Sequence, residues 1–222
     1  MPTPRELLLQ MLAEQSFHLG EFKLSSGGSS DYYIDCRATT LSGEGARLVG
    51  RVFYEEIYNS GTQPEAVGGL TLGADPIVTA VAMLSAQRIQ GRATERPGAI
   101  GEYFKLDGFL VRKTDKTHGM QQRIEGFRKK GAKVFIVDDV CTTGASTVEA
   151  IAAAREFGFQ VVGVLCLVER EEAGGRANIE KAAPGVPFVS LFTADEIREE
   201  HLRMRKHEDD PLLSLKREVG GE

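Results

Sequence analysis

The stretch Val134-Phe135-Ile136-Val137-Asp138-Asp139-Val140-Cys141-Thr142-Thr143-Gly144-Ala145-Ser146 decides the fold of this 222-residue chain. Its first four residues are apolar and typical of a short buried strand. Two acids follow at the carboxyl end of that strand, and a loop rich in hydroxyl groups leads into a helix predicted over residues 146–157. In an open α/β sheet, ligands bind where the carboxyl end of a strand leads into a helix. This stretch therefore predicts both an α/β fold and the position of a binding site.

Strand and helix patterns alternate on both sides of this stretch. The strand-like apolar runs are 66–69, 109–111 and 161–168, and the helix-like segments are 45–58 and 76–87. Buried strands separated by helices indicate a parallel sheet with helices on both faces. The predicted fold class is therefore α/β, with a parallel-sheet core.

Three segments fall outside this alternation and predict how the chain is divided. Residues 1–40 begin with a helix start at Thr3 and form a small amino-terminal unit. The core is predicted at 41–195, and a mostly charged extension follows at 196–222. Residues 92–107 contain proline and glycine beside two aromatic residues, which predicts a hairpin inserted into the core.

The composition argues against several classes of protein. The formal net charge is −5, and basic residues cluster only locally, so we expect no nucleic-acid partner. No apolar stretch approaches the roughly 18 residues that span a bilayer, and the first residues lack the layout of a secretory signal, so we expect no membrane partner. Three cysteines without a CxxC pair argue against a disulfide framework or a zinc site and favour the reducing cytoplasm.

The residues after the 134–137 strand can hold a phosphate and a sugar together. Free N–H groups at a helix start, aided by the helix dipole, bind phosphate, and the hydroxyls of residues 142–146 add donors. Asp138 and Asp139 would repel a phosphate, but they can accept hydrogen bonds from sugar hydroxyls. A phosphate beside a diol indicates ribose 5-phosphate. A strand-to-helix turn with two capping acids is the plainer alternative, although such a turn does not need two consecutive acids followed by Thr-Thr-Gly.

These residues resemble the signature with which type I phosphoribosyltransferases bind phosphoribosyl pyrophosphate. Three further blocks resemble orotate phosphoribosyltransferases in particular. Residues 22–35 are similar to their amino-terminal substrate hairpin, 68–76 to their pyrophosphate-side loop, and 112–119 to their mobile catalytic loop. The blocks occur in the family's order and together cover about residues 5–195.

The resemblance implies a fold, a reaction and an assembly. The fold would be the type I fold, with helices on both faces of a parallel sheet, a small amino-terminal hood and a mobile loop. The reaction would transfer the 5-phosphoribosyl group from phosphoribosyl pyrophosphate to orotate, giving orotidine 5′-phosphate and pyrophosphate in de novo pyrimidine biosynthesis. Mg²⁺ would be held mainly by substrate and water rather than by protein ligands. The protein would be a homodimer in which the mobile loop acts in trans, on the neighbouring subunit's site.

The resemblance also assigns the site residues. Those with catalytic roles are Lys113, Lys116 and Asp139. Those that bind phosphoribosyl pyrophosphate are Leu72, Gly73, Arg112, Lys113, Lys116, His118, Asp138, Asp139, Val140, Cys141, Thr142, Thr143, Gly144, Ala145 and Ser146. Those that bind orotate are Tyr33, Ile34, Thr142 and Arg170.

The basic residues of the 112–119 segment have a physical role in such a reaction. Pyrophosphate that leaves the anomeric carbon gains negative charge, which closing cations stabilise while they exclude water. Exclusion of water matters because a ribosyl cation would otherwise be hydrolysed. Taken alone, the segment is also typical of a solvated charged surface.

Arg170 follows the strand-like run 161–168 and favours orotate over a purine acceptor. Taken alone, it could form a surface ion pair with Glu169 or Glu171. At the corresponding position the family has an arginine that holds the orotate carboxylate, and a planar guanidinium can do so in bidentate fashion.

The chain departs from the family pattern at two positions and leaves two alternatives open. Ser25 and Gly73 stand where many members have lysine, and Lys23, on the same strand face as Ser25, could substitute. One alternative is a phosphoribosyltransferase for another base, which would not need Arg170. The other is a non-catalytic regulator with the same fold that binds RNA or DNA, which the acidic composition disfavours.

Overall fold

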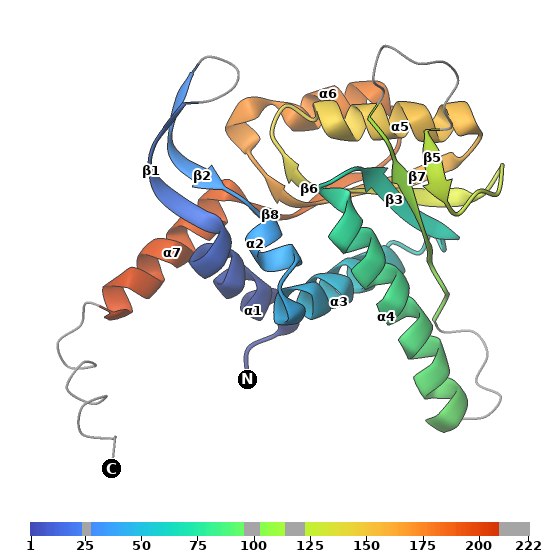
Figure 1. Cartoon of the computed structure of the whole chain (residues 1–222), viewed down its shortest axis with the longest axis horizontal. Helices are drawn as coiled ribbons and strands as arrows, with labels where there is room; N and C mark the ends of the chain where they lie inside the picture. Colours follow the sequence, from blue (N-terminus) through green and yellow to red (C-terminus); the bar gives the residue numbers. More distant parts are fainter. Residues whose placement is uncertain (24–27, 96–102, 114–122, 209–222) are drawn as a thin grey trace.

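The structure, a computed structural model, describes residues 1–23, 28–95, 103–113 and 123–208 (Figure 1). The strands of its main sheet are β3 (Ala66–Leu70), β4 (Asp107–Val111), β5 (Ile124–Gly126), β6 (Lys133–Cys141), β7 (Gln160–Glu169) and β8 (Phe188–Thr193). They lie in the order β5-β4-β3-β6-β7-β8. The β4–β5 pair is antiparallel and the other neighbouring pairs are parallel. The predicted parallel-sheet core is therefore confirmed.

Helices cover both faces of this sheet, as predicted. The helices beside it are α3 (Gly43–Asn59) and α4 (Ala74–Glu95) on one face, and α5 (Ala145–Phe157) and α6 (Gly175–Ala182) on the other (Figure 1). Side chains of β6 alternate between the faces: Phe135 and Val137 lie in the core with α3 and α4, whereas Val134 and Ile136 lie in the core with α5. In the part of the chain that the structure describes, no helix is long and apolar enough to cross a bilayer.

Strand β6 is longer than the sequence pattern indicated. It continues to Cys141 because Asp138 pairs with Cys166 of β7, and Cys141 pairs with Glu169. The acid pair therefore lies within the strand rather than after it. Pairing with a neighbouring strand fixes the backbone direction of both acids before the loop begins.

The amino-terminal unit combines a helix with a two-stranded arm. Its elements are α1 (Pro4–Met11), the π-helical turn η1 (Leu12–Ser16), β1 (Phe17–Lys23), β2 (Ser29–Ile34) and α2 (Arg37–Thr40). Helix α1 starts with a complete capping box between Thr3 and Glu6, as the sequence indicated. Strands β1 and β2 pair with each other and stand apart from the main sheet (Figure 1). Leu8 and Leu12 are buried in the same core as Leu48 of α3, which joins the unit to the sheet.

The carboxyl-terminal helix α7 (Ala194–Glu208) is part of the packed structure. Ile197 is fully buried in the core that α1 shares, and Nδ1 of His201 lies 2.7 Å from the carbonyl oxygen of Ala13. The boundary predicted between residues 195 and 196 therefore falls inside a helix that packs against the amino-terminal unit. Residues 209–222 of the predicted extension lie outside the described residues.

The hairpin predicted at 92–107 is wrong for the part of that segment that the structure describes. Residues 92–95 continue helix α4, and 96–102 lie outside the described residues. Phe104 packs against Tyr54 of α3 with ring centroids 5.8 Å apart, and the Tyr54 hydroxyl donates a hydrogen bond to the Phe104 carbonyl at 2.9 Å. The aromatic residues of the segment therefore cover helix α3 instead of pairing as strands.

Candidate active site

The first acid of the pair, Asp138, is buried, with 3% of its surface exposed. Its Oδ2 accepts hydrogen bonds from the hydroxyls of Ser146 at 2.8 Å and Thr147 at 2.6 Å, and its Oδ1 accepts from the Asp139 N–H at 3.1 Å. Burial raises the pKa of Asp138 to about 6, and the two hydroxyls oppose that rise. Asp138 thus holds the start of α5 against the end of β6.

The second acid, Asp139, is partly exposed and lies against the turn that follows β3. Its Oδ1 accepts the Val140 N–H at 2.9 Å. Gly73 approaches so closely that a Cβ atom added there would lie 2.6 Å from the Asp139 Cγ. A side chain at residue 73, where many family members have lysine, would therefore displace the Asp139 carboxylate from the position it has here. Leu72 is 71% exposed beside it, and its peptide bond with Thr71 is cis.

The hydroxyl loop, residues 142–146, leaves backbone donors free at the start of α5. Gly144 is in the left-handed region at φ +73°, and no side chain caps the helix. The first helical hydrogen bond runs from the Val148 N–H to the Gly144 carbonyl at 2.8 Å. The N–H groups that precede it have no partner within the helix, which is the arrangement that binds anions.

Helix α6 supports the hydroxyl loop from behind. A Cβ at Gly175 would overlap the Thr142 carbonyl oxygen and lie 2.6 Å from the sulfur of Cys141, which is buried. Asn178 donates its side-chain N–H to the Thr143 carbonyl at 3.0 Å. The sequence reasoning missed Gly175 and Asn178, although the Gly-Gly pair soon after Arg170 was a possible signal.

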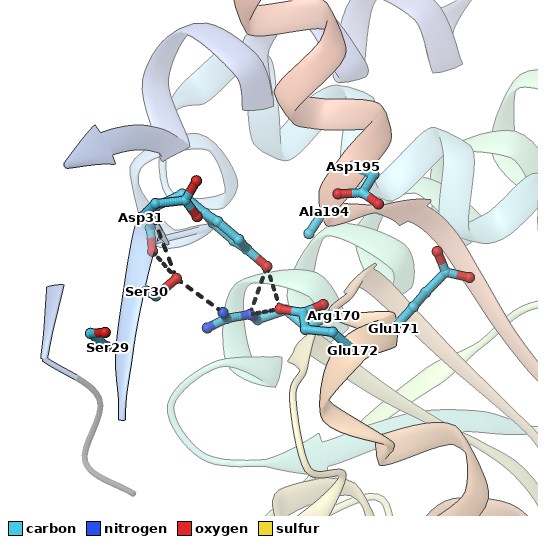
Figure 2. Close-up of a pocket in the computed structure, with 9 residues that line it drawn as sticks. Ser29, Ser30, Asp31, Arg170, Glu171, Glu172, Ala194 and Asp195 are labelled. Atoms are coloured by element: carbon cyan, nitrogen blue, oxygen red, sulfur yellow. Dashed lines mark hydrogen bonds and ion pairs between the residues drawn. The ribbon is translucent and has the colours of Figure 1, made fainter. Parts of the chain in front are cut away.

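Arg170 lies at the end of β7 and is held on several sides (Figure 2). Its N–H donates to the Cys141 carbonyl at 2.9 Å, which places it beside the end of β6. Its Nε donates to the Tyr32 hydroxyl at 2.9 Å and to Glu172 Oε1 at 3.0 Å, and its Nη2 donates to the Ser30 hydroxyl at 3.3 Å. The guanidinium carbon lies 4.6 Å from the centre of the Tyr32 ring. We call Ser30, Tyr32, Arg170 and Glu172 the arginine cluster.

The surface ion pair considered for Arg170 is wrong in both of its partners. Glu169 is buried and pairs in bidentate fashion with Arg176, whose Nε lies 3.0 Å from Oε1. Glu171 points away from Arg170 (Figure 2). The Arg170 side chain is only 13% exposed. It is therefore a partly buried cation whose partners come from the amino-terminal arm and from Glu172.

A cavity of about 400 Å³ adjoins the arginine cluster. Its lining residues are Ser29, Ser30, Asp31, Tyr32, Arg170, Glu171, Glu172, Ala194 and Asp195. Burial, followed by the hydrogen bond to Glu172, raises the pKa of Tyr32 to about 12. Tyr32 therefore stays protonated and donates to Glu172 Oε1 at 2.6 Å while it accepts from Arg170.

The residues proposed to bind the acceptor ring lie on both sides of β2. Tyr33 is 43% exposed and packs against Phe22 with ring centroids 5.5 Å apart. Ile34 is partly buried against the core. Tyr32 contacts Arg170, although the sequence reasoning singled out its neighbour. The binding roles of Tyr33 and Ile34 stay predictions.

The basic segment after β4 is described only in part. Arg112 and Lys113 follow the carboxyl end of β4, and Arg112 Nη1 lies 3.0 Å from Glu125 Oε1 in an exposed pair. Lys116 and His118 lie outside the described residues. Within the residues that the structure describes, no group of three His, Cys, Asp or Glu side chains could hold a metal ion.

The predicted site residues that are described gather at one edge of the sheet. Because β3, β4, β6 and β7 run parallel, their carboxyl ends meet there. That edge receives Gly73 after β3, Lys113 after β4, the hydroxyl loop after β6 and Arg170 after β7. The loop offers donors suited to a phosphate, Asp139 offers a partly exposed acceptor, and Arg170 offers a fixed cation.

Comparison with known proteins gives a consistent result. The model of a family described as "Phosphoribosyl transferase domain" matches residues 54–183. The chain is 41% identical over 196 residues to orotate phosphoribosyltransferase of Aquifex aeolicus, covering 87% of this chain and 97% of that protein. The crystal structure of Mycobacterium tuberculosis H37Rv orotate phosphoribosyltransferase in complex with Fe(III) dicitrate matches with a TM-score of 0.68 and 35% identity, covering 88% of this chain and 99% of the other. The structure of that enzyme in complex with 5-phospho-alpha-D-ribosyl 1-diphosphate matches with a TM-score of 0.66 and 31% identity, at the same coverage.

Proposed function

This chain belongs to the phosphoribosyl transferase family, and from that membership we propose that it transfers the 5-phosphoribosyl group from phosphoribosyl pyrophosphate to orotate. The products are orotidine 5′-phosphate and pyrophosphate, in pyrimidine biosynthesis. The observation that carries the proposal is the hydroxyl loop, whose first-turn N–H groups lie at the same sheet edge as Asp139 and Arg170. A phosphate, a sugar diol and a carboxylate each have a suitable partner at that edge.

The hydroxyl loop and the acid pair are proposed to hold the donor. The N–H groups of residues 142–146 and the hydroxyls of Thr142 and Thr143 bind the 5′-phosphate, and the partly exposed Asp139 accepts from a ribose hydroxyl. Asp138 is assigned to the diol as well. Because its carboxylate already accepts from Ser146 and Thr147, its additional effect is to fix the loop. Positioning of this kind supplies much of the rate in a reaction that has little proton transfer.

The cations after β4 are proposed to stabilise the departing pyrophosphate. The bond from the anomeric carbon to the pyrophosphate oxygen breaks, and its electron pair leaves with the pyrophosphate. The nitrogen of the deprotonated orotate ring attacks the opposite face of the oxocarbenium-like sugar. Arg112, Lys113, Lys116 and His118 meet the growing negative charge. Mg²⁺, held mainly by donor and water, would neutralise part of that charge, and the partly exposed Asp139 carboxylate is suited to accept hydrogen bonds from the water bound to Mg²⁺.

Arg170 is proposed to select the acceptor by its carboxylate. Its guanidinium is already ordered by Tyr32 and Glu172, so binding costs little additional side-chain entropy. Tyr33 and Ile34 would flank the pyrimidine ring, and Thr142 would contact it from the loop. A base without a carboxylate would leave Arg170 without that partner.

A homodimer in which the basic loop acts in trans is also proposed. Leu41, Leu72 and Met83 are exposed by 70%, 71% and 55%, and all three line an apolar cavity of about 640 Å³ beside the Gly73 turn. Coverage of this face by a second copy would bury it. The three cysteines, each buried as a free thiol, favour the cytoplasm as the location.

Trans action can be tested by mixing two inactive variants. Lys116→Ala removes the loop cation and Asp139→Asn alters the donor site. In a mixed dimer, one site combines an intact Asp139 with the partner's intact loop. Mixing should therefore restore roughly one quarter of wild-type activity, whereas a loop that acts within its own subunit predicts no recovery.

The reaction itself is tested with purified protein, Mg²⁺, phosphoribosyl pyrophosphate and a panel of orotate, uracil and adenine. Loss of orotate absorbance is the expected result. Use of another base instead would indicate a related transferase, and use of none would favour the regulator.

Lys116→Ala should lower turnover by about 100-fold without changing the free energy of unfolding, and an unchanged rate would remove the loop from the mechanism.

A further inference from the structure

The arginine cluster leaves one edge of the Arg170 guanidinium available. A guanidinium has five N–H groups, and a carboxylate can bind either the Nε–Nη2 edge or the Nη1–Nη2 edge. Tyr32 and Glu172 accept from Nε, and Ser30 accepts from Nη2. The Nε–Nη2 edge is therefore filled by the chain itself. Among the described residues, none accepts a hydrogen bond from Nη1.

The groups that fill this edge are themselves fixed. Tyr32 is 7% exposed, stacks on Phe17 with ring centroids 5.4 Å apart, and donates to Glu172 at 2.6 Å. Its ring also lies beneath the guanidinium. Tyr32 comes from strand β2 of the arm, and Glu172 from the 3₁₀ turn η2 (Glu171–Ala173). Both partners must therefore be in place for Arg170 to keep its orientation.

We infer that Tyr32 and Glu172 are positioning residues, which hold Arg170 so that its Nη1–Nη2 edge receives the carboxylate of the acceptor. The inference rests on the proposed function and deepens it. It predicts that the two residues affect the binding of a carboxylate-bearing base without contacting that base. The arm therefore contributes to acceptor selection through Arg170.

The negative charge of Glu172 leads to the opposite expectation for orotate binding, and an experiment can distinguish the two. If Glu172 acted only as a negative charge, it would repel the acceptor carboxylate, and removing it would tighten orotate binding. If it acts as a hydrogen-bond acceptor that orients Arg170, removing it weakens orotate binding. Glutamine keeps an oxygen acceptor at that position and should preserve the orientation.

The test compares Glu172→Ala, Glu172→Gln and Tyr32→Phe in steady-state kinetics. Glu172→Ala should raise the KM for orotate about 10-fold, and should lower the preference for orotate over uracil by a similar factor. The KM for phosphoribosyl pyrophosphate should stay within about twofold of wild type, and Glu172→Gln should restore most of the loss. Tyr32→Phe keeps the ring but loses the hydroxyl, so we expect a rise of about 3-fold.

Two variants serve as matched controls. Glu156→Gln changes an exposed glutamate at the carboxyl end of helix α5, away from the cavity, and Tyr58→Phe removes a hydroxyl on helix α3. Both should keep wild-type constants. If Glu172→Ala folds poorly, the preference for orotate over uracil in Glu172→Gln and Tyr32→Phe still shows whether the two residues orient Arg170.

Three results would overturn the inference. One is an unchanged KM for orotate in Glu172→Ala, another is a lower KM in both Glu172 variants, and the third is an equal rise in the KM of both substrates. Failure of the proposed function looks different, because the wild-type protein would then not consume orotate. Failure of the Arg170 role also looks different, because Arg170→Met would leave the KM for orotate unchanged.

Discussion

The hydroxyl loop and the arginine cluster differ in how far the chain satisfies its own polar groups. Among the described residues, no side chain caps the first-turn N–H groups of α5, and α6 supports the loop from behind through Gly175 and Asn178. In the cluster, Arg170 has three side-chain partners from the chain itself and an aromatic ring beneath it. The N–H groups of the loop therefore need a ligand to accept their hydrogen bonds. Arg170, in contrast, is already oriented before the ligand binds, and its Nη1–Nη2 edge is left for the ligand.

The largest effect is expected where the loop depends on α6. Gly175→Ala adds a Cβ that overlaps the Thr142 carbonyl and lies 2.6 Å from the Cys141 sulfur, so the loop must move. We expect kcat/KM for phosphoribosyl pyrophosphate to fall by about 100-fold, which corresponds to about 2.7 kcal/mol. Gly43→Ala is the matched control, because nothing lies near the added atom. Normal donor kinetics in Gly175→Ala would show that the loop does not need this support.

A smaller and more selective effect is expected in the cluster. Arg170→Met keeps most of the side-chain volume but removes the cation, so the KM for orotate should rise by about 30-fold, which corresponds to the loss of a charged hydrogen bond. The KM for phosphoribosyl pyrophosphate should change little, because the donor binds at the loop. Equal changes in both constants, measured at saturating co-substrate, would mean that the two regions do not act separately.

The last effect, on stability and not on catalysis, concerns the link between Asp138 and the loop. Because burial raises the pKa of Asp138 to about 6, the folded protein keeps a proton that the unfolded chain loses near pH 4. The stability due to this proton is complete at about pH 4 and below, and it is lost as the pH rises through about 6. Asp138→Asn removes the titration, so its free energy of unfolding should rise by roughly 2 to 3 kcal/mol relative to wild type between about pH 4 and pH 7. Urea unfolding at both pH values measures this gain, and a difference that does not depend on pH would contradict a buried carboxyl group.

The same contrast explains what the sequence could predict. The strand, acid pair, loop and helix around residues 134–157 are contiguous, so apolar periodicity and the loop composition were sufficient to locate them. The capping box of Thr3 and Glu6 is equally local. Short strands such as β5 and β8, and the continuation of β6 to Cys141, depend on pairing with strands elsewhere in the chain and were missed.

The arginine cluster could not be predicted for a similar reason. Tyr32 and Tyr33 are identical neighbours, and only the register of β1 with β2 decides which of them faces Arg170, 138 residues away. The pairing of Glu169 with Arg176, rather than with Arg170, likewise depends on how α6 packs against α5 and β8. Resemblance to a family identified Arg170, but its partners required the structure.

A crystal structure with bound ribose 5-phosphate would show directly whether the hydroxyl loop is the phosphate site. We expect the phosphate within about 3 Å of the N–H groups of residues 142–146, with a ribose hydroxyl on Asp139. A ligand bound elsewhere, with the hydroxyl loop empty and Asp139 engaged by a protein cation, would contradict this expectation.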